Sequence, residues 1–458
     1  MLTTIATPST GLRLEPAADA RPLSLLDRGA LALGIFEIPL QIDKYFLFHE
    51  RDAQLGAVGG INVSITTCCL VVVYIAWFAE AAVQRLRVRA PVIVGVPMVA
   101  YLATVLLSCL VAMLPLLAVC DLVVLLQAYA LFFYVANRVQ ARDDILFCIV
   151  VLAGTLLFQS GLICGLTLLG DRAAGQEFHF GPLVLAVWMD GRPAGSMHSA
   201  VVAGSLMALI WMPSMAATFI MRPGRIRSFV VVATGAGLLA ILLTQTRGAI
   251  LTILSGSLLF GAAMLIRGWL PRSTIYLVLV LAVIGIYPLY RVVEKRVHGD
   301  DDGSAESRKH LAAIAAEMIE DHPLFGYGAG NCHLAGERYA NQGKFRSEWY
   351  YTVHCKYLLV WIETGIAGLV TFLAVLGNGL RHGWSAWTRR DRSWAPLGLG
   401  LVGALAGHMV HMSVDIFNSR TQVQMLWLVL GLAAAVWRAS HRIEPTWGTS
   451  IKEAAHVT

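Results

Sequence analysis

The chain has 458 residues, of which 57% are hydrophobic and only 14% are charged, and its mean hydropathy is +0.66. A soluble domain carries about 25% charged residues, so this composition excludes a soluble globular protein. The formal net charge is +6. In so apolar a chain, we interpret this excess of positive charge as a signal of which side of the membrane each loop lies on. We expect no nucleic-acid partner.

Apolar stretches of roughly 20 residues recur along most of the chain, and each is long enough to cross the hydrocarbon layer of a membrane. Backbone groups in that layer must bond internally, which predicts helices. We therefore expect an all-α polytopic membrane protein with about twelve transmembrane helices. The predicted spans lie near residues 29–48, 61–81, 91–111, 114–136, 145–169, 197–220, 228–246, 249–266, 273–291, 353–376, 394–414 and 421–438.

Arginines gather in every second connection between these spans and in both terminal segments. An even number of spans with both ends in the cytoplasm requires this alternation. We expect the inner membrane, with residues 1–28 and 439–458 cytoplasmic, residues 29–291 forming nine spans and residues 353–438 three more. The arginines concerned are Arg13, Arg21, Arg28, Arg85, Arg87, Arg89, Arg138, Arg142, Arg222, Arg225, Arg227, Arg267, Arg272, Arg381, Arg389, Arg390, Arg392, Arg438 and Arg442.

Residues 292–352 form the only outer connection large enough for its own structure. Leu311, Ile314 and Met318 recur at helical spacing and predict an amphipathic helix over about residues 305–320, capped by Ser304 or Asp302. A proline then stops the helix, and three glycines at alternate positions, Gly326, Gly328 and Gly330, permit a tight backbone path before Asn331.

Three polar residues on the predicted outer side are candidates for chemistry. Arg247 stands between two spans with almost no loop; it either snorkels to the headgroups or grips a lipid-borne phosphate. Arg308 lies in the first turn of the loop helix, where the helix dipole repels a cation; it is either an exposed surface residue or part of an anion site. His354 opens the tenth span and is either an interfacial histidine or a general base.

A second polar group lies near the outer end of the eleventh span. His408, His411 and Asp415 share one helix face, which raises the alternative of a metal site, but no fourth ligand is evident. We expect a buried polar network instead, with Asp415 paired to Arg420 across the short turn. Glu37 lies in the first predicted span, so a proton pathway stays an alternative. No chain of acidic residues in other spans supports it.

Several of these stretches together resemble a known family. Thr246-Arg247-Gly248 is similar to the Ser-Arg-Gly signature of the O-antigen ligase and Wzy-type polymerase superfamily. Ser307-Arg308, followed by the segment from His322 to Asn331, resembles its outer-loop motif. The ligase pattern, a histidine, a small polar residue, nine residues and Gly-x-x-Gly, is matched by His354, Cys355, Gly365 and Gly368.

The resemblance implies a metal-independent, inverting glycosyltransferase without a cofactor, working on the periplasmic face. Its donor would be a glycan on undecaprenyl pyrophosphate, and its acceptor a saccharide or lipid A core within the surrounding lipids. Carried over by residue, Arg247 and Arg308 would bind the pyrophosphate and His354 would take the acceptor's proton. Gly326, Gly328, Gly330 and Asn331 would support the site.

Two cysteines depart from the family pattern. Cys355 replaces the residue that usually follows the histidine, and Cys332 stands where an aromatic residue commonly follows the glycine turn. Both lie on the predicted oxidising face, so we hypothesise a disulfide between them.

Ligase and polymerase share this machinery, and so does a protein O-glycosylating ligase. The spacing around His354 favours the ligase; a polymerase of O-antigen or exopolysaccharide repeats is the alternative. A twelve-span secondary transporter belongs to a different class, and we find neither an internal repeat nor paired broken helices to favour it. A non-catalytic assembly partner also stays open.

Overall fold

The computed structural model describes residues 22–83, 92–188, 190–270, 304–340 and 351–442. Within these ranges the chain is mainly helical, and eight helices are long and apolar enough to cross a membrane. The chain is therefore a polytopic helical membrane protein, as predicted. The eight helices are α3 (Ile65–Val83), α5 (Pro115–Arg138), α6 (Arg142–Leu169), α7 (Ala200–Ala217), α8 (Arg225–Leu243), α9 (Arg247–Ile266), α13 (Lys356–Thr388) and α15 (Arg420–Ser440).

Three shorter helices occupy other predicted spans: α1 (Leu25–Glu37), α4 (Val96–Ser108) and α14 (Ala395–His411). The ninth predicted span, residues 273–291, lies outside the described residues. The total of twelve therefore stays a prediction.

The first predicted span is wrong in extent. Helix α1 ends at Glu37, and the chain passes through a short 3-10 turn, η1 (Ile38–Leu40), into strand β1 (Asp43–Phe46). Pro39 has no backbone N–H to continue the helix, and Gln41 adopts a left-handed φ of 54°. Strand β1 pairs antiparallel with β2 (Ile61–Ser64), which precedes α3.

A second small sheet, also absent from the all-α prediction, joins α6 to α7. After the 3-10 turn η2 (Gly170–Ala173), its strands run antiparallel in the order β3 (Glu177–Phe180), β4 (Leu183–Val187), β5 (Pro193–Gly195). The periodicity that predicts spans does not detect such short strands.

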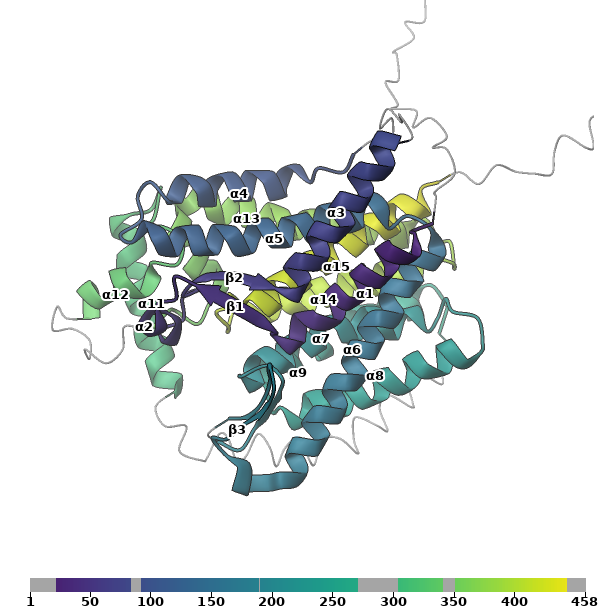
Figure 1. The fold of residues 1–458 in the computed structure, drawn as a ribbon, viewed down its shortest axis with the longest axis horizontal. Helices are drawn as coiled ribbons and strands as arrows, with labels where there is room; N and C mark the ends of the chain where they lie inside the picture. The colour runs from purple at the N-terminus through teal and green to yellow at the C-terminus, as the bar shows by residue number, and fades with distance from the viewer. Residues whose placement is uncertain (1–21, 84–91, 189, 271–303, 341–350, 443–458) are drawn as a thin grey trace, which may run out of the picture.

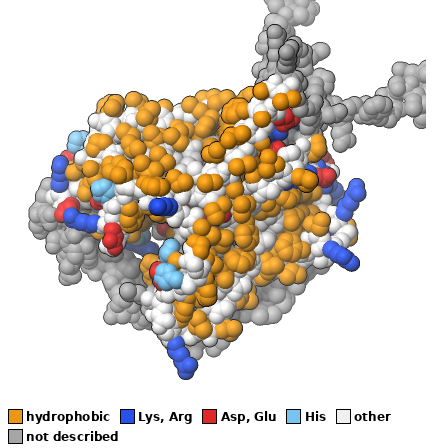
Figure 2. All heavy atoms as spheres, in the orientation of Figure 1, with side chains coloured by type: hydrophobic (Ala, Val, Ile, Leu, Met, Phe, Trp, Pro, Cys, Tyr) orange, Lys and Arg blue, Asp and Glu red, His pale blue; other side chains and the backbone are white. Residues whose placement is uncertain are grey.

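The centre of the bundle is formed by α7, α14 and α15, which are buried on nearly all sides. Small residues let these helices approach one another: a Cβ on Gly256 of α9 would lie 2.7 Å from the Gly403 carbonyl oxygen of α14. Such contacts are typical of helix packing in membranes. Helices α3 and α8 leave an apolar face exposed, and Figure 2 shows hydrophobic side chains over most of the visible face, with most charged ones towards its two sides.

Three helices outside the spans gather at one end of the bundle: α2 (Glu50–Gln54), α11 (Ser304–Asp321) and α12 (Cys332–Ala340) (Figure 1). We call this the loop end. Helix α11 confirms the predicted amphipathic helix; its buried Leu311, Ile314 and Met318 pack in one apolar cluster with Val353 and Ile362. Ser304 is its first helical residue, and Asp302 lies outside the described residues.

Candidate active site

His354 lies in a short irregular segment that is held on one side by the end of α2 and on the other by the end of α14. Two residues before it, the N–H and Oγ1 of Thr352 donate to the Leu55 carbonyl, at 3.2 and 2.9 Å. Two residues after it, the N–H of Lys356 donates to the Met412 carbonyl at the end of α14, at 2.8 Å. The main chain around His354 is therefore held on both sides.

The surroundings of His354 combine burial with two opposite charges. Its ring stacks on Tyr351, with centroids 5.4 Å apart, and its Nδ1 is buried without a hydrogen-bond partner in the described part of the chain. Burial and then the positive charge of Arg308 lower the pKa of His354, and the negative charge of Asp415 and the Thr352 carbonyl oppose them. The net lowering favours a neutral imidazole near pH 7, which is able to accept a proton.

Asp415 connects His354 to a chain of buried polar side chains. Its Oδ2 accepts from Nε2 of Gln422 at 2.9 Å and lies 3.9 Å from Nε2 of His411. Nε2 of Gln422 also donates to Oγ of Ser205, which lies 3.1 Å from Nε2 of His408. The buried polar network predicted around His408, His411 and Asp415 is thus present.

The structure bears on two further ideas about this region, the Asp415–Arg420 pair and the metal site. The predicted pair of Asp415 with Arg420 is wrong, because Arg420 points to Glu37 and Asp43 instead. No group of three or more histidine, cysteine or acidic side chains arranged to hold a metal ion occurs among the described residues.

Arg247 is the first residue of α9 and is exposed. Gly248, next to it, lies so close to the His411 ring that any Cβ at this position would overlap it. Oγ1 of Thr246 donates to the Ala200 carbonyl at 2.9 Å and fixes the preceding turn. The glycine therefore sets the close packing of the α9 N-terminus on His411, the neighbour of Asp415.

The glycine-rich turn, residues 323–331, docks into a break in α13. Gly365 has φ 69° and ψ −173°, which interrupts the helix and changes the partners of nearby backbone groups. The carbonyls of Ile362 and Glu363 accept the N–H groups of Tyr327 and Gly328, both at 2.8 Å. In return, the N–H of Ile366 donates to the Pro323 carbonyl at 2.9 Å.

Glycines on both sides make this exchange possible. A Cβ on Gly365 would overlap the Leu324 carbonyl, and one on Gly326, whose φ is 66°, would overlap that of Ile362. Interrupted backbone within a membrane helix is tolerated where other protein groups satisfy it, as the turn does here. Gly365, the first glycine of the Gly-x-x-Gly pattern after His354, thus has a structural reason that the sequence does not reveal.

Asn331 ties the other end of the turn to the connection between α4 and α5. Its Oδ1 accepts from the N–H of Leu114 at 2.7 Å, and its Nδ2 donates to the Ala329 carbonyl at 2.7 Å. Gly328 packs directly on Ala112. The glycines and Asn331 therefore shape and anchor the turn.

The disulfide hypothesised between Cys332 and Cys355 is absent, because both are free thiols. Both pack in the apolar cluster beneath α11, where Cys332 is buried. Burial raises the pKa of the Cys332 thiol to about 12. Little thiolate, the form that reacts, is therefore present near neutral pH.

Residues 229–373, less than half of the chain, match the model of a family described as O-antigen ligase. The match confirms the resemblance that the motifs indicated. Arg247, Arg308, His354 and the glycine-rich turn all lie within the matched residues. No curated protein matches the chain.

Proposed function

Since residues 229–373 belong to the O-antigen ligase and Wzy-type superfamily, which implies glycosyltransferase-like activity on a lipid-linked glycan, we propose that this protein moves a glycan from a lipid pyrophosphate to an acceptor hydroxyl. The observation that carries the proposal is the position of His354. It is a half-buried imidazole with a lowered pKa, placed within electrostatic reach of both Arg308 and Asp415.

In this proposal His354 is the general base. It takes the proton from the acceptor hydroxyl as the oxygen attacks the anomeric carbon of the donor sugar, and the bond from that carbon to the pyrophosphate oxygen breaks. The proton arrives on an imidazole within electrostatic reach of Asp415, whose negative charge stabilises the imidazolium. Attack opposite the leaving group inverts the anomeric centre.

Arg308 and Arg247 bind the pyrophosphate and stabilise the charge that develops on it, so no metal ion is required in this mechanism. Arg308 also links donor binding to the base. Its positive charge lowers the pKa of His354 while the site is free. A bound pyrophosphate neutralises that charge, so His354 becomes a stronger base once the donor is present.

For the donor we propose a glycan on undecaprenyl pyrophosphate, presented at the loop end on the periplasmic side of the inner membrane. We propose a ligase that uses a saccharide or lipid A core as acceptor, because the spacing from His354 to Gly365 and Gly368 follows the ligase pattern. Polymerisation of O-antigen or exopolysaccharide repeats is the other outcome of the test.

The test is reconstitution of the purified protein in lipid vesicles with an undecaprenyl-pyrophosphate-linked repeat unit. Transfer to added lipid A core, without a ladder when the donor is alone, supports the ligase. A ladder of longer glycans from the donor alone indicates a polymerase. In either case His354→Ala must abolish the product; full activity of that variant would overturn the proposal.

A further inference from the structure

A small cavity with a mostly apolar lining lies beside the glycine-rich turn, separate from the cluster around His354. Its volume is about 40 Å³, and it is enclosed by α4, α5, α13, α15 and Ala329 of the turn. Since a water molecule needs about 10–15 Å³, the cavity has room for a few. Three ionisable side chains from two helices line it: Asp121 of α5, and Lys356 and Glu363 of α13.

Lys356 is a buried cation. The residue is only 9% exposed. The two carboxylates of Asp121 and Glu363 are its electrostatic partners across the cavity. A buried charge is tolerated when opposite charge balances it, so the ammonium and the carboxylates depend on one another.

Glu363 holds the glycine-rich turn with both its main chain and its side chain. Its carbonyl accepts the N–H of Gly328, and its carboxylate is approached by the N–H groups of Gly330 and Cys332, the first residue of α12. Asp121 flanks the same turn, since its Oδ2 lies 3.3 Å from the Cβ position of Gly330. Both carboxylates therefore meet the turn where α12 begins.

The residues around the cavity belong to the two segments that carry Arg308 and His354. The turn continues from α11, which carries Arg308, and Lys356 opens α13 two residues after His354. A shift of the turn relative to α13 would change the distance between the pyrophosphate cation and the base. Small misplacements of reacting groups are costly, up to about 100-fold in rate for about 1 Å.

We propose that Glu363 and Lys356 are positioning residues, which with Asp121 form a clamp of one ammonium and two carboxyl groups that holds the glycine-rich turn on α13 and so aligns Arg308 with His354. The part of this proposal that concerns alignment rests on the proposed function. The clamp itself does not, because it concerns the docking of the turn.

The experiment compares purified, monodisperse Glu363→Ala, Glu363→Gln, Lys356→Met and the double variant Lys356→Met/Glu363→Gln. Turnover and the KM for the lipid-linked donor are measured in the reconstituted assay. Hydrogen–deuterium exchange of peptides over residues 323–340 is measured on the same samples. Glu320→Gln, an exposed carboxylate on α11, is the matched control.

Glu363→Ala and Lys356→Met are expected to lower kcat by about 10- to 100-fold with little change in KM, and to speed exchange in the turn. Glu363→Gln keeps an acceptor for the turn's N–H groups and should stay closest to wild type. The double variant should recover part of the Lys356→Met loss, because it removes one of two carboxylates left without a cation. A merely structural role would reduce the yield of folded protein while leaving kcat unchanged.

Unchanged exchange in Glu363→Ala and Lys356→Met would overturn the clamp, and so would a double variant no better than Lys356→Met. Faster exchange with wild-type kcat would overturn the alignment of Arg308 with His354. An inactive wild type, or an active His354→Ala, would instead contradict the proposed function, while the exchange data still decide the clamp.

Discussion

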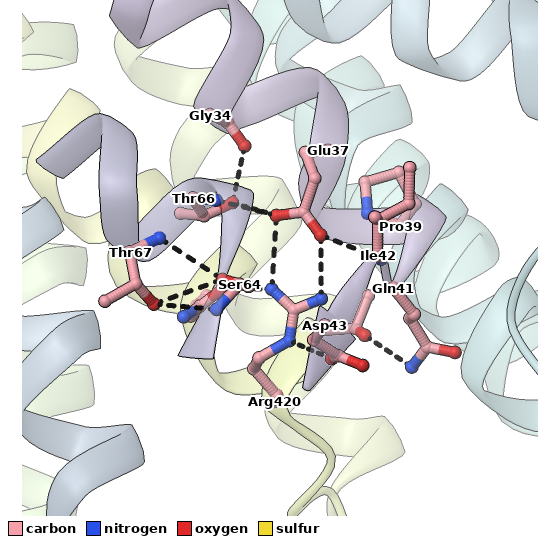
Figure 3. Close-up of polar contacts among 12 residues, drawn as sticks. Gly34, Glu37, Pro39, Gln41, Ile42, Asp43, Ser64, Thr66, Thr67 and Arg420 are labelled. Carbon is pink, nitrogen blue, oxygen red and sulfur yellow. Dashed lines mark hydrogen bonds and ion pairs between the residues drawn. The ribbon is translucent and has the colours of Figure 1, made fainter. Parts of the chain in front are cut away.

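Two arginines, Arg420 and Arg308, show how differently the same side chain is used. Arg420 is buried, with its side chain only 2% exposed, and two carboxylates enclose it: Glu37 at 3.1 Å and Asp43 at 3.0 Å. Figure 3 shows its guanidinium between the two acids. Arg308 is exposed on α11 and acts on a histidine.

The surroundings of Arg420 leave it no capacity for a ligand. Glu37 also accepts the N–H groups of Ile42 at 3.1 Å and Thr66 at 2.9 Å, so the cluster ties α1, η1, β1 and α3 to the start of α15 (Figure 3). An arginine buried between two carboxylates holds helices and strands together; an exposed one near a half-buried base is available to an anion. The following predictions test this difference, from the largest expected effect to the smallest.

His354→Ala should lower turnover by about 10²- to 10⁴-fold, the usual contribution of a general base. Donor binding should be largely retained, because the pyrophosphate is assigned to the arginines. Since Nδ1 of His354 has no partner in the described part of the chain, thermal stability should change little. Turnover, donor affinity and melting temperature are measured together; loss of donor binding would make His354 a ligand and not a base.

Arg420→Gln should show the opposite pattern. Removing one partner of a buried ion pair costs about 3–5 kcal/mol, because the remaining charges are left uncompensated. The melting temperature in detergent or lipid should fall, while turnover per folded molecule stays near wild type. Adding Glu37→Gln to this variant should recover part of the stability. A stable but inactive Arg420→Gln would place Arg420 in the reaction and contradict the comparison.

Arg308→Lys should lower turnover by about 10- to 100-fold, the range expected when a charge-assisted hydrogen bond is lost. Lysine keeps the charge but offers a point cation in place of a planar fork. The adjacent exposed Lys309→Arg is the matched control and should leave activity unchanged. If lysine at 308 works as well as arginine, the role in pyrophosphate binding is wrong.

The smallest effect is a shift of the pH–rate profile. Asp415 raises the pKa of His354, so Asp415→Asn should move the acid limb of kcat/KM to lower pH, where the imidazole now stays neutral. Arg308 lowers that pKa, so Arg308→Gln should move the same limb to higher pH. Equal profiles for both variants would show that His354 is not the titrating base.

Much of the fold could be predicted from periodicity alone. Long apolar stretches predicted most of the described spans, and Leu311, Ile314 and Met318 predicted α11, because burying one helix face requires this local spacing. Strands β1 to β5 were missed. They are too short to carry a clear pattern, and their pairing depends on partners elsewhere in the chain.

The sequence by itself determined which residue types the candidate site contains: Arg247, Arg308 and His354 stand in motifs that the family match covers. Only the tertiary structure decided what each neighbouring group does. It turned Arg420 towards Glu37 and Asp43, brought Asp415 to His354, and docked the glycine-rich turn into the break at Gly365. Local spacing predicts a helix, but charge pairing depends on which groups the fold buries together.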